Sequence, residues 1–181
     1  MPPPAIKTIE DLLFWQYAKI IAESAGFGKK KYGFIMNRYK KLKSGEIHWS
    51  TSIREYIKER EVHDKCIYCG SEEKEKLTKE HILPQSRQGP EKLSNIVFVC
   101  KKCNSRKGDK RLYEWFGLKN RNRIPRIAEG KYLKLLYDLH GNFGTLHMTA
   151  PELCPMCDLE PKCPVHEKLS VYCLEGLFQK K

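Results

Sequence analysis

Four cysteines in two closely spaced pairs could hold a metal ion near the middle of the chain. The pairs are Cys66-x2-Cys69 and Cys100-x2-Cys103. Two such pairs are typical of a structural zinc site, in which four thiolates bind the ion tetrahedrally. The bound ion closes the intervening chain into a compact loop and supplies folding free energy that so short a segment cannot obtain from an apolar core. We therefore expect one structural Zn²⁺ at these four residues.

Residues suited to acid–base chemistry lie inside and just after this loop. His81 can take a proton from water near pH 7, because the unperturbed pKa of imidazole is about 6.5. Glu80 and Asn104 offer the carboxylate and amide oxygens that Mg²⁺ prefers over thiolates. Successive side chains of a strand point to opposite faces, so Glu80 and His81 cannot share one flat face. Either the strand is irregular at this point, or the metal and the base act from two sides.

This stretch resembles the motif of HNH endonucleases, which have the ββα-metal nuclease fold, in the subset framed by a four-cysteine zinc site. The resemblance covers about residues 62–116, roughly a third of the chain. His81 matches the first conserved His of that motif, Asn95 its central Asn, and Asn104 its third position, which makes an H-N-N version. Glu80 precedes the His where the family often has Asp, and its side chain is one methylene longer.

The resemblance implies a metal-dependent endonuclease that hydrolyses phosphodiester bonds in DNA, with RNA not excluded. His81 would act as the general base that activates water, and Glu80 and Asn104 would hold a catalytic Mg²⁺ or Mn²⁺. Asn95 would orient the loop that carries His81. The alternative is a non-catalytic, zinc-dependent nucleic-acid-binding protein, because four-cysteine zinc ribbons are common in such proteins. The joint presence of Glu80, His81 and Asn104 favours the enzyme.

The distribution of charge indicates a polyanionic partner. The chain of 181 residues carries 34 Lys and Arg against 22 acidic residues, a formal net charge of +12. Residues 101–134 hold twelve basic and three acidic residues, whereas residues 135–181 hold four basic and six acidic ones. A uniformly basic, solvated surface would not concentrate charge in this way, so we expect nucleic acid as the partner. The candidate contact residues are Arg106, Lys107, Lys110, Arg111, Arg121 and Arg123.

The elements that must position these residues define an α+β fold with a zinc-framed ββα-metal core. We expect one strand at Glu80-His81, a second over Asn95–Val99, and a helix from Cys103 to about Phe116. Thr8 begins a pattern typical of a helix N-terminus, and two further helices are expected over 29–43 and 51–60. The expected regions are a basic helical arm (1–61), the HNH core (62–116), a basic extension with a packing helix (117–145) and a Cys-rich module (146–181).

A second group of cysteines predicts another metal site near the end of the sequence. Cys154, Cys157, Cys163 and Cys173 fall within twenty residues of one another. The first hypothesis is a structural zinc, with His166 as a possible replacement for one thiol. The uneven spacing also suits a [4Fe–4S] cluster, which takes four cysteinates. Free thiols are the third alternative.

Neither a membrane nor a secretory role is expected. No apolar run reaches the length needed to span a bilayer, and the first residues lack the pattern of a signal peptide. We therefore expect an intracellular protein, in which clustered cysteines bind metals in preference to forming disulfides. The sequence leaves the oligomeric state open.

Overall fold

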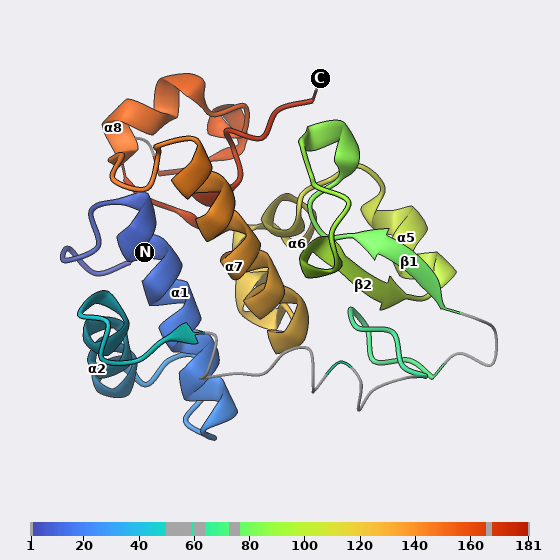
Figure 1. The fold of residues 1–181 in the computed structure, drawn as a ribbon, viewed down its shortest axis with the longest axis horizontal. Helices are drawn as coiled ribbons and strands as arrows, with labels where there is room; N and C mark the ends of the chain where they lie inside the picture. The colour runs from blue at the N-terminus through green and yellow to red at the C-terminus, as the bar shows by residue number, and fades with distance from the viewer. Residues whose placement is uncertain (1, 50–58, 60–63, 73–76, 166–167, 181) are drawn as a thin grey trace. The chain divides into compact units, whose positions relative to one another are not determined.

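The computed structural model describes residues 2–49, 59, 64–72, 77–165 and 168–180 (Figure 1). The chain forms two compact units. The first unit comprises residues 1–53 and 136–177, and the second comprises residues 54–135 and 178–181. Helix α7 (Arg126–Asn142) contributes residues to both. The four regions expected from the sequence remain a prediction.

Helices dominate the first unit. Helix α1 (Ile9–Ser24) begins at Thr8, whose hydroxyl accepts a hydrogen bond from the amide of Asp11 at 3.2 Å. The carboxylate of Asp11 accepts one in return from the amide of Thr8, which completes the capping box that the sequence indicates. Helix α2 (Tyr32–Lys43) packs against α1. Tyr137 of α7 stacks on Phe14 of α1, with ring centroids 5.7 Å apart. The remaining elements of this unit are α8 (Ala150–Leu153) and the 3-10 helices η4 (Cys154–Met156), η5 (Glu160–Lys162) and η6 (Val171–Leu174).

A two-stranded antiparallel sheet forms the centre of the second unit. Strand β1 (Thr78–His81) pairs with β2 (Ile96–Val99), so that Glu80 lies opposite Val97 and His81 opposite Ile96. Side chains alternate between the two faces of a strand. Thr78 and Glu80 therefore lie on one face, and Lys79 and His81 lie on the other. The face that carries Thr78 and Glu80 contacts helix α5.

The helix that follows the sheet is shorter than the sequence pattern indicates. The expected single helix from Cys103 to Phe116 is two helices, α5 (Lys101–Lys107) and α6 (Leu112–Asn120). Gly108 ends α5 with a φ of 54°. Residues with a Cβ atom rarely adopt this value, whereas glycine adopts it readily. The chain turns there before Arg111 begins α6. The prediction of one continuous helix is therefore wrong.

A loop with two short 3-10 helices joins the strands. Helix η1 spans Gln85–Arg87, and η2 spans Leu93–Asn95. Asn95 was expected in the second strand, but it ends η2, and β2 begins one residue later. A further 3-10 helix, η3 (Arg121–Arg123), follows α6. The expected helix 51–60 lies almost entirely outside the described residues. Within the described parts of the chain, no helix combines the length and apolar character needed to cross a membrane.

Candidate active site

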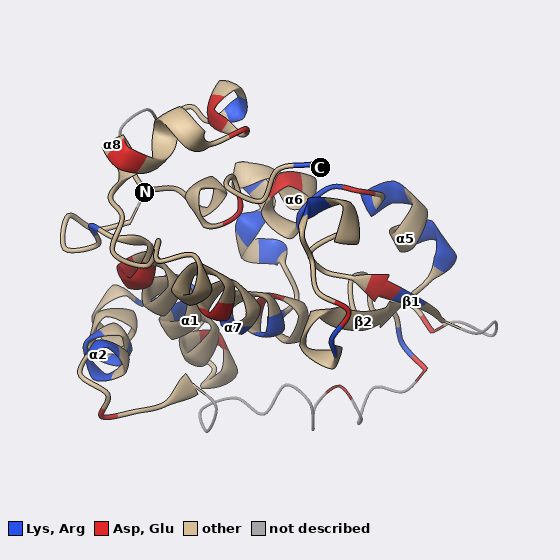
Figure 2. Cartoon of the chain, turned by 45° about the horizontal axis from the view of Figure 1, so that its top comes forward, with Lys and Arg blue, Asp and Glu red and all other residues tan. Residues whose placement is uncertain are grey.

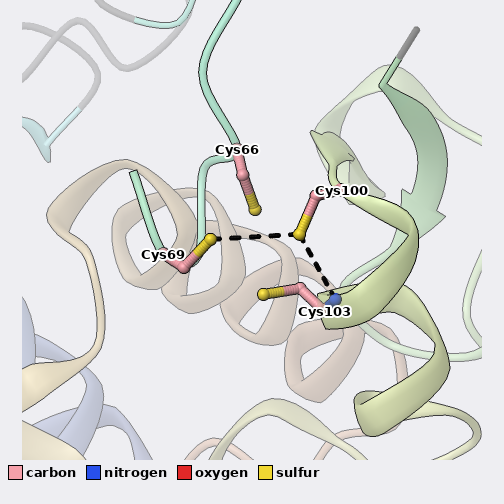
Figure 3. A group of neighbouring side chains, drawn as sticks. All are labelled: Cys66, Cys69, Cys100 and Cys103. Carbon is pink, nitrogen blue, oxygen red and sulfur yellow. Dashed lines mark hydrogen bonds between the residues drawn. The ribbon is translucent and has the colours of Figure 1, made fainter. Parts of the chain in front are cut away.

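The sulfur atoms of Cys66, Cys69, Cys100 and Cys103 point toward one centre (Figure 3). We call these residues the first cysteine quartet. All four Sγ atoms lie within 4.8 Å of one another, and Cys69 and Cys100 are 3.9 Å apart. A zinc ion with Zn–S distances of about 2.3 Å would hold its thiolates about 3.8 Å apart. The geometry therefore suits a tetrahedral metal ion such as zinc.

The surroundings of these thiols shift their pKa values in different directions. Burial raises the pKa of Cys66 and of Cys103. Burial acts in the same direction on Cys69, but hydrogen bonds with Ser71, Cys66 and Cys103 together outweigh it and lower the pKa of Cys69 to about 7. Four thiolates at this separation repel one another, and a divalent cation between them removes that repulsion. Both ends of the loop contribute: Cys66 and Cys69 precede β1, whereas Cys100 caps α5 and Cys103 lies inside it.

The carboxylate of Glu80 is buried and bonded through both of its oxygens. Oε1 accepts a hydrogen bond from Nζ of Lys107 at 2.6 Å, and Oε2 accepts one from the hydroxyl of Tyr68 at 2.7 Å. Nζ of Lys107 also donates to the backbone carbonyl of His81 at 2.9 Å. Burial, together with the charge of Glu80, raises the pKa of Tyr68 well above its usual value, so its hydroxyl remains a donor. This network joins the turn between Cys66 and Cys69, β1 and α5.

Lys107 was expected to contact nucleic acid, but its position does not allow that. Its side chain is fully buried, and its ammonium is the counter-charge of Glu80. A buried carboxylate needs such a partner, because an uncompensated charge in the interior is costly. Asn104, one turn earlier on α5, donates from Nδ2 to the hydroxyl of Thr78 at 3.1 Å. Its amide oxygen is therefore the atom that it could offer to a metal.

His81 lies at the end of β1 on the opposite face of the sheet. Its Nε2 is 2.6 Å from Oε2 of Glu91, and the imidazole side chain is 21 % exposed. Glu91 also accepts hydrogen bonds from Lys79 and from Nε2 of Gln85, the latter at 2.7 Å. The bonds from Lys79 and His81 lower the pKa of Glu91. The candidate base is therefore accessible to solvent, whereas Glu80 is not.

Asn95 holds the loop that follows His81. Its buried side chain accepts a hydrogen bond from the amide of Leu83 at 2.8 Å, and donates to the carbonyls of Leu83 at 2.9 Å and Pro90 at 3.0 Å. Gly89 packs against the same backbone, where a Cβ atom would lie 1.9 Å from the carbonyl oxygen of Leu83. A side chain at this position would thus displace the loop. The two ends of the loop are fixed to each other within two residues of His81.

The basic residues of this unit divide into exposed and buried ones. Figure 2 shows Lys and Arg along α5. Arg106, Lys110 and Arg123 are exposed, and Arg121 is half-buried. Arg111 was expected on the binding surface, but it is buried and donates to the carboxylate of Glu114 at 3.2 Å and to the carbonyl of Phe178 at 3.1 Å. Its guanidinium satisfies groups inside the protein and is not available to a phosphate.

The C-terminal cysteines lie in the first unit. We call Cys154, Cys157, Cys163 and Cys173 the second cysteine quartet. The hydroxyl of Ser170 lies 3.4 Å from Sγ of Cys163 and 4.0 Å from Sγ of Cys173. Burial raises the pKa of Cys173. Cys157 packs against the backbone of Gly176, where a Cβ atom would be only 2.0 Å from its sulfur.

The second cysteine quartet is less convergent than the first. Among the described residues, only the first quartet brings three or more metal-binding side chains within 4.8 Å of one another. His166 lies outside the described residues. The expected second metal centre therefore remains a prediction.

Three residues of this site were not expected from the sequence. Tyr68 lies between Cys66 and Cys69, and an aromatic residue at such a position is a signal that could have suggested packing against β1. Lys79 alternates with Glu80, which places it on the face of His81. Nothing in the sequence marks Glu91, because its approach to His81 depends on the path of the loop.

Comparisons with known proteins agree with this geometry. A family profile described as HNH endonuclease matches residues 66–114. The chain is also 29 % identical over 116 residues to YoqL of Bacillus subtilis (strain 168), an SPbeta prophage-derived protein whose name assigns it to the HNH endonucleases. That alignment covers 55 % of this chain and 46 % of YoqL, so the chain matches about half the length of that relative. No solved structure matches the chain significantly. Residues 66–114 are therefore similar to the HNH endonuclease family.

Proposed function

We propose that the protein is a metal-dependent endonuclease that hydrolyses phosphodiester bonds in DNA. The observation that carries the proposal is the position of His81. It lies on the solvent-accessible face of the sheet, at the start of a loop that Asn95 holds by three hydrogen bonds, within the segment that matches the HNH family. A fixed, accessible imidazole can take a proton from a water molecule that attacks phosphorus.

Glu80 and Asn104 are the proposed ligands of a catalytic Mg²⁺ or Mn²⁺. Both side chains lie between β1 and α5, and their carboxylate and amide oxygens are the donors that hard divalent ions take. In the network, Nζ of Lys107 forms an ion pair with Glu80. The donor chemistry therefore fits, although the ion must share Glu80 with Lys107 and Tyr68. When bound, such an ion supplies positive charge that stabilises the phosphoryl and leaving oxygens.

The first cysteine quartet is proposed to hold a structural Zn²⁺. One thiol pair, Cys66 and Cys69, precedes β1, and the other lies at the start of α5. One ion would therefore fix both ends of the segment that contains Glu80 and His81. A closed site of four thiolates has no open position for substrate, which is the pattern of structural and not catalytic zinc. The ion would position the active site without touching the reacting atoms.

DNA is proposed to contact the exposed basic residues of the second unit. Arg106, Lys110, Arg121 and Arg123 remain candidates, because their side chains are at least partly exposed. Lys107 and Arg111 are excluded from the proposed contacts, because their cationic groups donate hydrogen bonds to carboxylates within the protein. The basic regions 1–61 and 117–145, which flank the core in the sequence, would add contacts to backbone phosphates.

The second cysteine quartet is proposed to bind a second, structural centre, either Zn²⁺ or a [4Fe–4S] cluster. Four thiols within twenty residues motivate this proposal. The thiols of Cys163 and Cys173 also both lie near the hydroxyl of Ser170. Anaerobic purification separates the two identities, because only iron gives a brown protein with charge-transfer absorption. Folded protein with a single thiolate-bound metal per chain and no iron would remove this part of the proposal.

A plasmid-nicking assay tests the nuclease. We expect supercoiled DNA to be nicked or linearised when Mg²⁺ or Mn²⁺ is added, and to stay intact when it is omitted. The variant His81→Ala is the control against a contaminating nuclease, since it should bind DNA and cut far more slowly. Binding without any metal-dependent cleavage would favour the alternative of a non-catalytic, zinc-dependent nucleic-acid-binding protein.

A further inference from the structure

Three hydrogen-bond donors on the open face of the sheet converge on one carboxylate. The side chains of Lys79, His81 and Gln85 all reach Glu91, with His81 Nε2 at 2.6 Å and Gln85 Nε2 at 2.7 Å from the same oxygen. Lys79 bonds the other carboxylate oxygen and forms an ion pair with it. The donors come from β1 and η1, whereas Glu91 comes from the far end of the loop. Donors from separate elements thus form a small cradle for an anion.

The chemistry of this cradle suits a phosphodiester as well as a carboxylate. Both anions carry one negative charge on two oxygens and accept hydrogen bonds from N–H groups. A lysine, an imidazole and an amide are the kinds of donor that contact nucleic-acid phosphates. His81, the candidate general base, is one of the three donors; because its Nε2 donates to the carboxylate, Nδ1 is the ring nitrogen left to accept a proton. A phosphate bound here would therefore lie directly beside the group proposed to activate water.

The side chain of Glu91 can separate from its three donors at little cost. Its side chain is 52 % exposed, and so is that of Lys79. Exposed ion pairs contribute little to stability, because water solvates both partners when they separate. Glu91 lies in the loop immediately after Gly89-Pro90, outside the helices and strands. Its rotation into solvent would break neither the sheet nor the hydrogen bonds of Asn95.

We propose that Glu91 occupies, in the free protein, the position of a backbone phosphate of the DNA substrate. Lys79 and Gln85 then join His81 as the donors that bind this phosphate once Glu91 has turned away. The proposal rests on the proposed function, since it assigns a phosphate subsite to the same face. It makes Glu91 an internal competitor of the substrate, and Lys79 and Gln85 contact residues of the active site.

Binding of a labelled DNA duplex without added divalent ion tests this directly. Fluorescence anisotropy would compare the parent with Glu91→Gln, which keeps the shape of the side chain and removes its charge. Glu72→Gln is the matched control, because Glu72 is also exposed and also pairs with one lysine, Lys65. Equal melting curves would show that all three proteins are folded.

We expect Glu91→Gln to tighten binding about two- to fivefold, the range that an exposed ion pair allows, and Glu72→Gln to change it less. Lys79→Met should weaken binding and reduce the log–log salt slope by about one. In the double variant of Lys79 and Glu91 most of the gain from Glu91→Gln should disappear, because the cation that it frees is missing.

Unchanged or weaker binding by Glu91→Gln would overturn the proposal. If its cleavage rate also fell, Glu91 would be a positioning residue of His81 and not a competitor of DNA. Failure of the nuclease function looks different, because binding is measured where no cleavage can occur. A protein that showed the expected changes in affinity and never cut DNA would keep the phosphate site and lose the enzymatic role.

Discussion

Two Glu–Lys pairs lie on opposite faces of the same small sheet. On the face that contacts α5, Glu80 pairs with Lys107, and their side chains are 5 % and 0 % exposed. On the open face, Glu91 pairs with Lys79, and both side chains are 52 % exposed. The two pairs have the same chemistry, and each makes a hydrogen bond to His81. They differ in their access to water.

Because of this difference, the buried pair suits a structural role, and the exposed pair suits a contact that a ligand can replace. Removing one partner of a buried ion pair leaves an uncompensated charge in the interior, whereas an exposed charge is solvated at once. The buried pair can therefore hold β1 on α5 permanently, and the exposed pair can open for a ligand. His81 is bound to both, through its backbone carbonyl to Lys107 and through its imidazole to Glu91. Its backbone is fixed while its ring faces a replaceable partner.

The largest effect is expected from the structural Zn²⁺ proposed for the first cysteine quartet. We predict that Cys100→Ser abolishes zinc binding and the cooperative unfolding of the segment 66–114, because four thiolates are needed for a closed site and Cys100 begins α5. Elemental analysis and a thermal melt measure the two effects. Cys163→Ser, in the second cysteine quartet, is the control and should keep the zinc of the first quartet. A soluble Cys100→Ser protein that melts like the parent would contradict this.

The two lysines provide the next test, since the same substitution can be made in each pair. Lys107→Met should lower the free energy of unfolding by about 3–5 kcal/mol, because it leaves Glu80 charged and buried. Lys79→Met should change it by less than about 0.5 kcal/mol, as is usual for exposed sites. Chemical denaturation measures both. Equal losses of stability for the two variants would remove the distinction between the faces.

The third test changes the chemistry of the open face and leaves its structure alone. We predict that His81→Ala lowers the rate of metal-dependent cleavage by about 10²–10⁴-fold, the usual contribution of a general base. The melting curve should stay close to that of the parent, because the imidazole is partly exposed. Single-turnover cleavage at saturating enzyme measures the chemical step apart from binding. A rate within a few-fold of the parent would exclude His81 as the base.

Much of this site could be predicted from short-range patterns. The spacing of the first cysteine quartet indicates one metal centre, and the four sulfurs do converge. The alternation of side chains along a strand predicts that Glu80 and His81 face opposite ways, and the register of β1 and β2 agrees. Such patterns depend only on the covalent chain and on local geometry, so a single sequence contains them.

The partners of the charged residues could not be predicted in the same way. Lys107 follows the second cysteine pair among other basic residues, and nothing local distinguishes it from the exposed Arg106. Its burial depends on how α5 packs on the face of Glu80, which is a tertiary property. Gly108 ends α5 early for a backbone reason that the apolar pattern does not contain. The approach of Glu91 to His81 likewise depends on a loop conformation that Asn95 determines.

The smallest expected effect concerns the hydroxyl that Tyr68 contributes to the buried face. Tyr68 and Tyr113 are both buried, and each donates to a buried glutamate, Glu80 at 2.7 Å and Glu129 at 3.1 Å. Replacing either by Phe leaves a carboxylate oxygen without that donor, which should cost about 1–3 kcal/mol of stability in both cases. Stability alone would therefore not distinguish them.

Their dependence on divalent ions should differ, because only Glu80 is proposed to bind one. In Tyr68→Phe, Oε2 of Glu80 loses a hydrogen bond that competes with metal binding. The Mg²⁺ concentration for half-maximal cleavage should fall about two- to tenfold, the equivalent of one hydrogen bond. Tyr113→Phe should leave it unchanged. Titration with Mn²⁺, followed by its electron paramagnetic resonance signal, measures the same affinity without turnover. An unchanged or increased metal requirement in Tyr68→Phe would mean that Glu80 serves the buried face alone, and that the catalytic ion has other ligands.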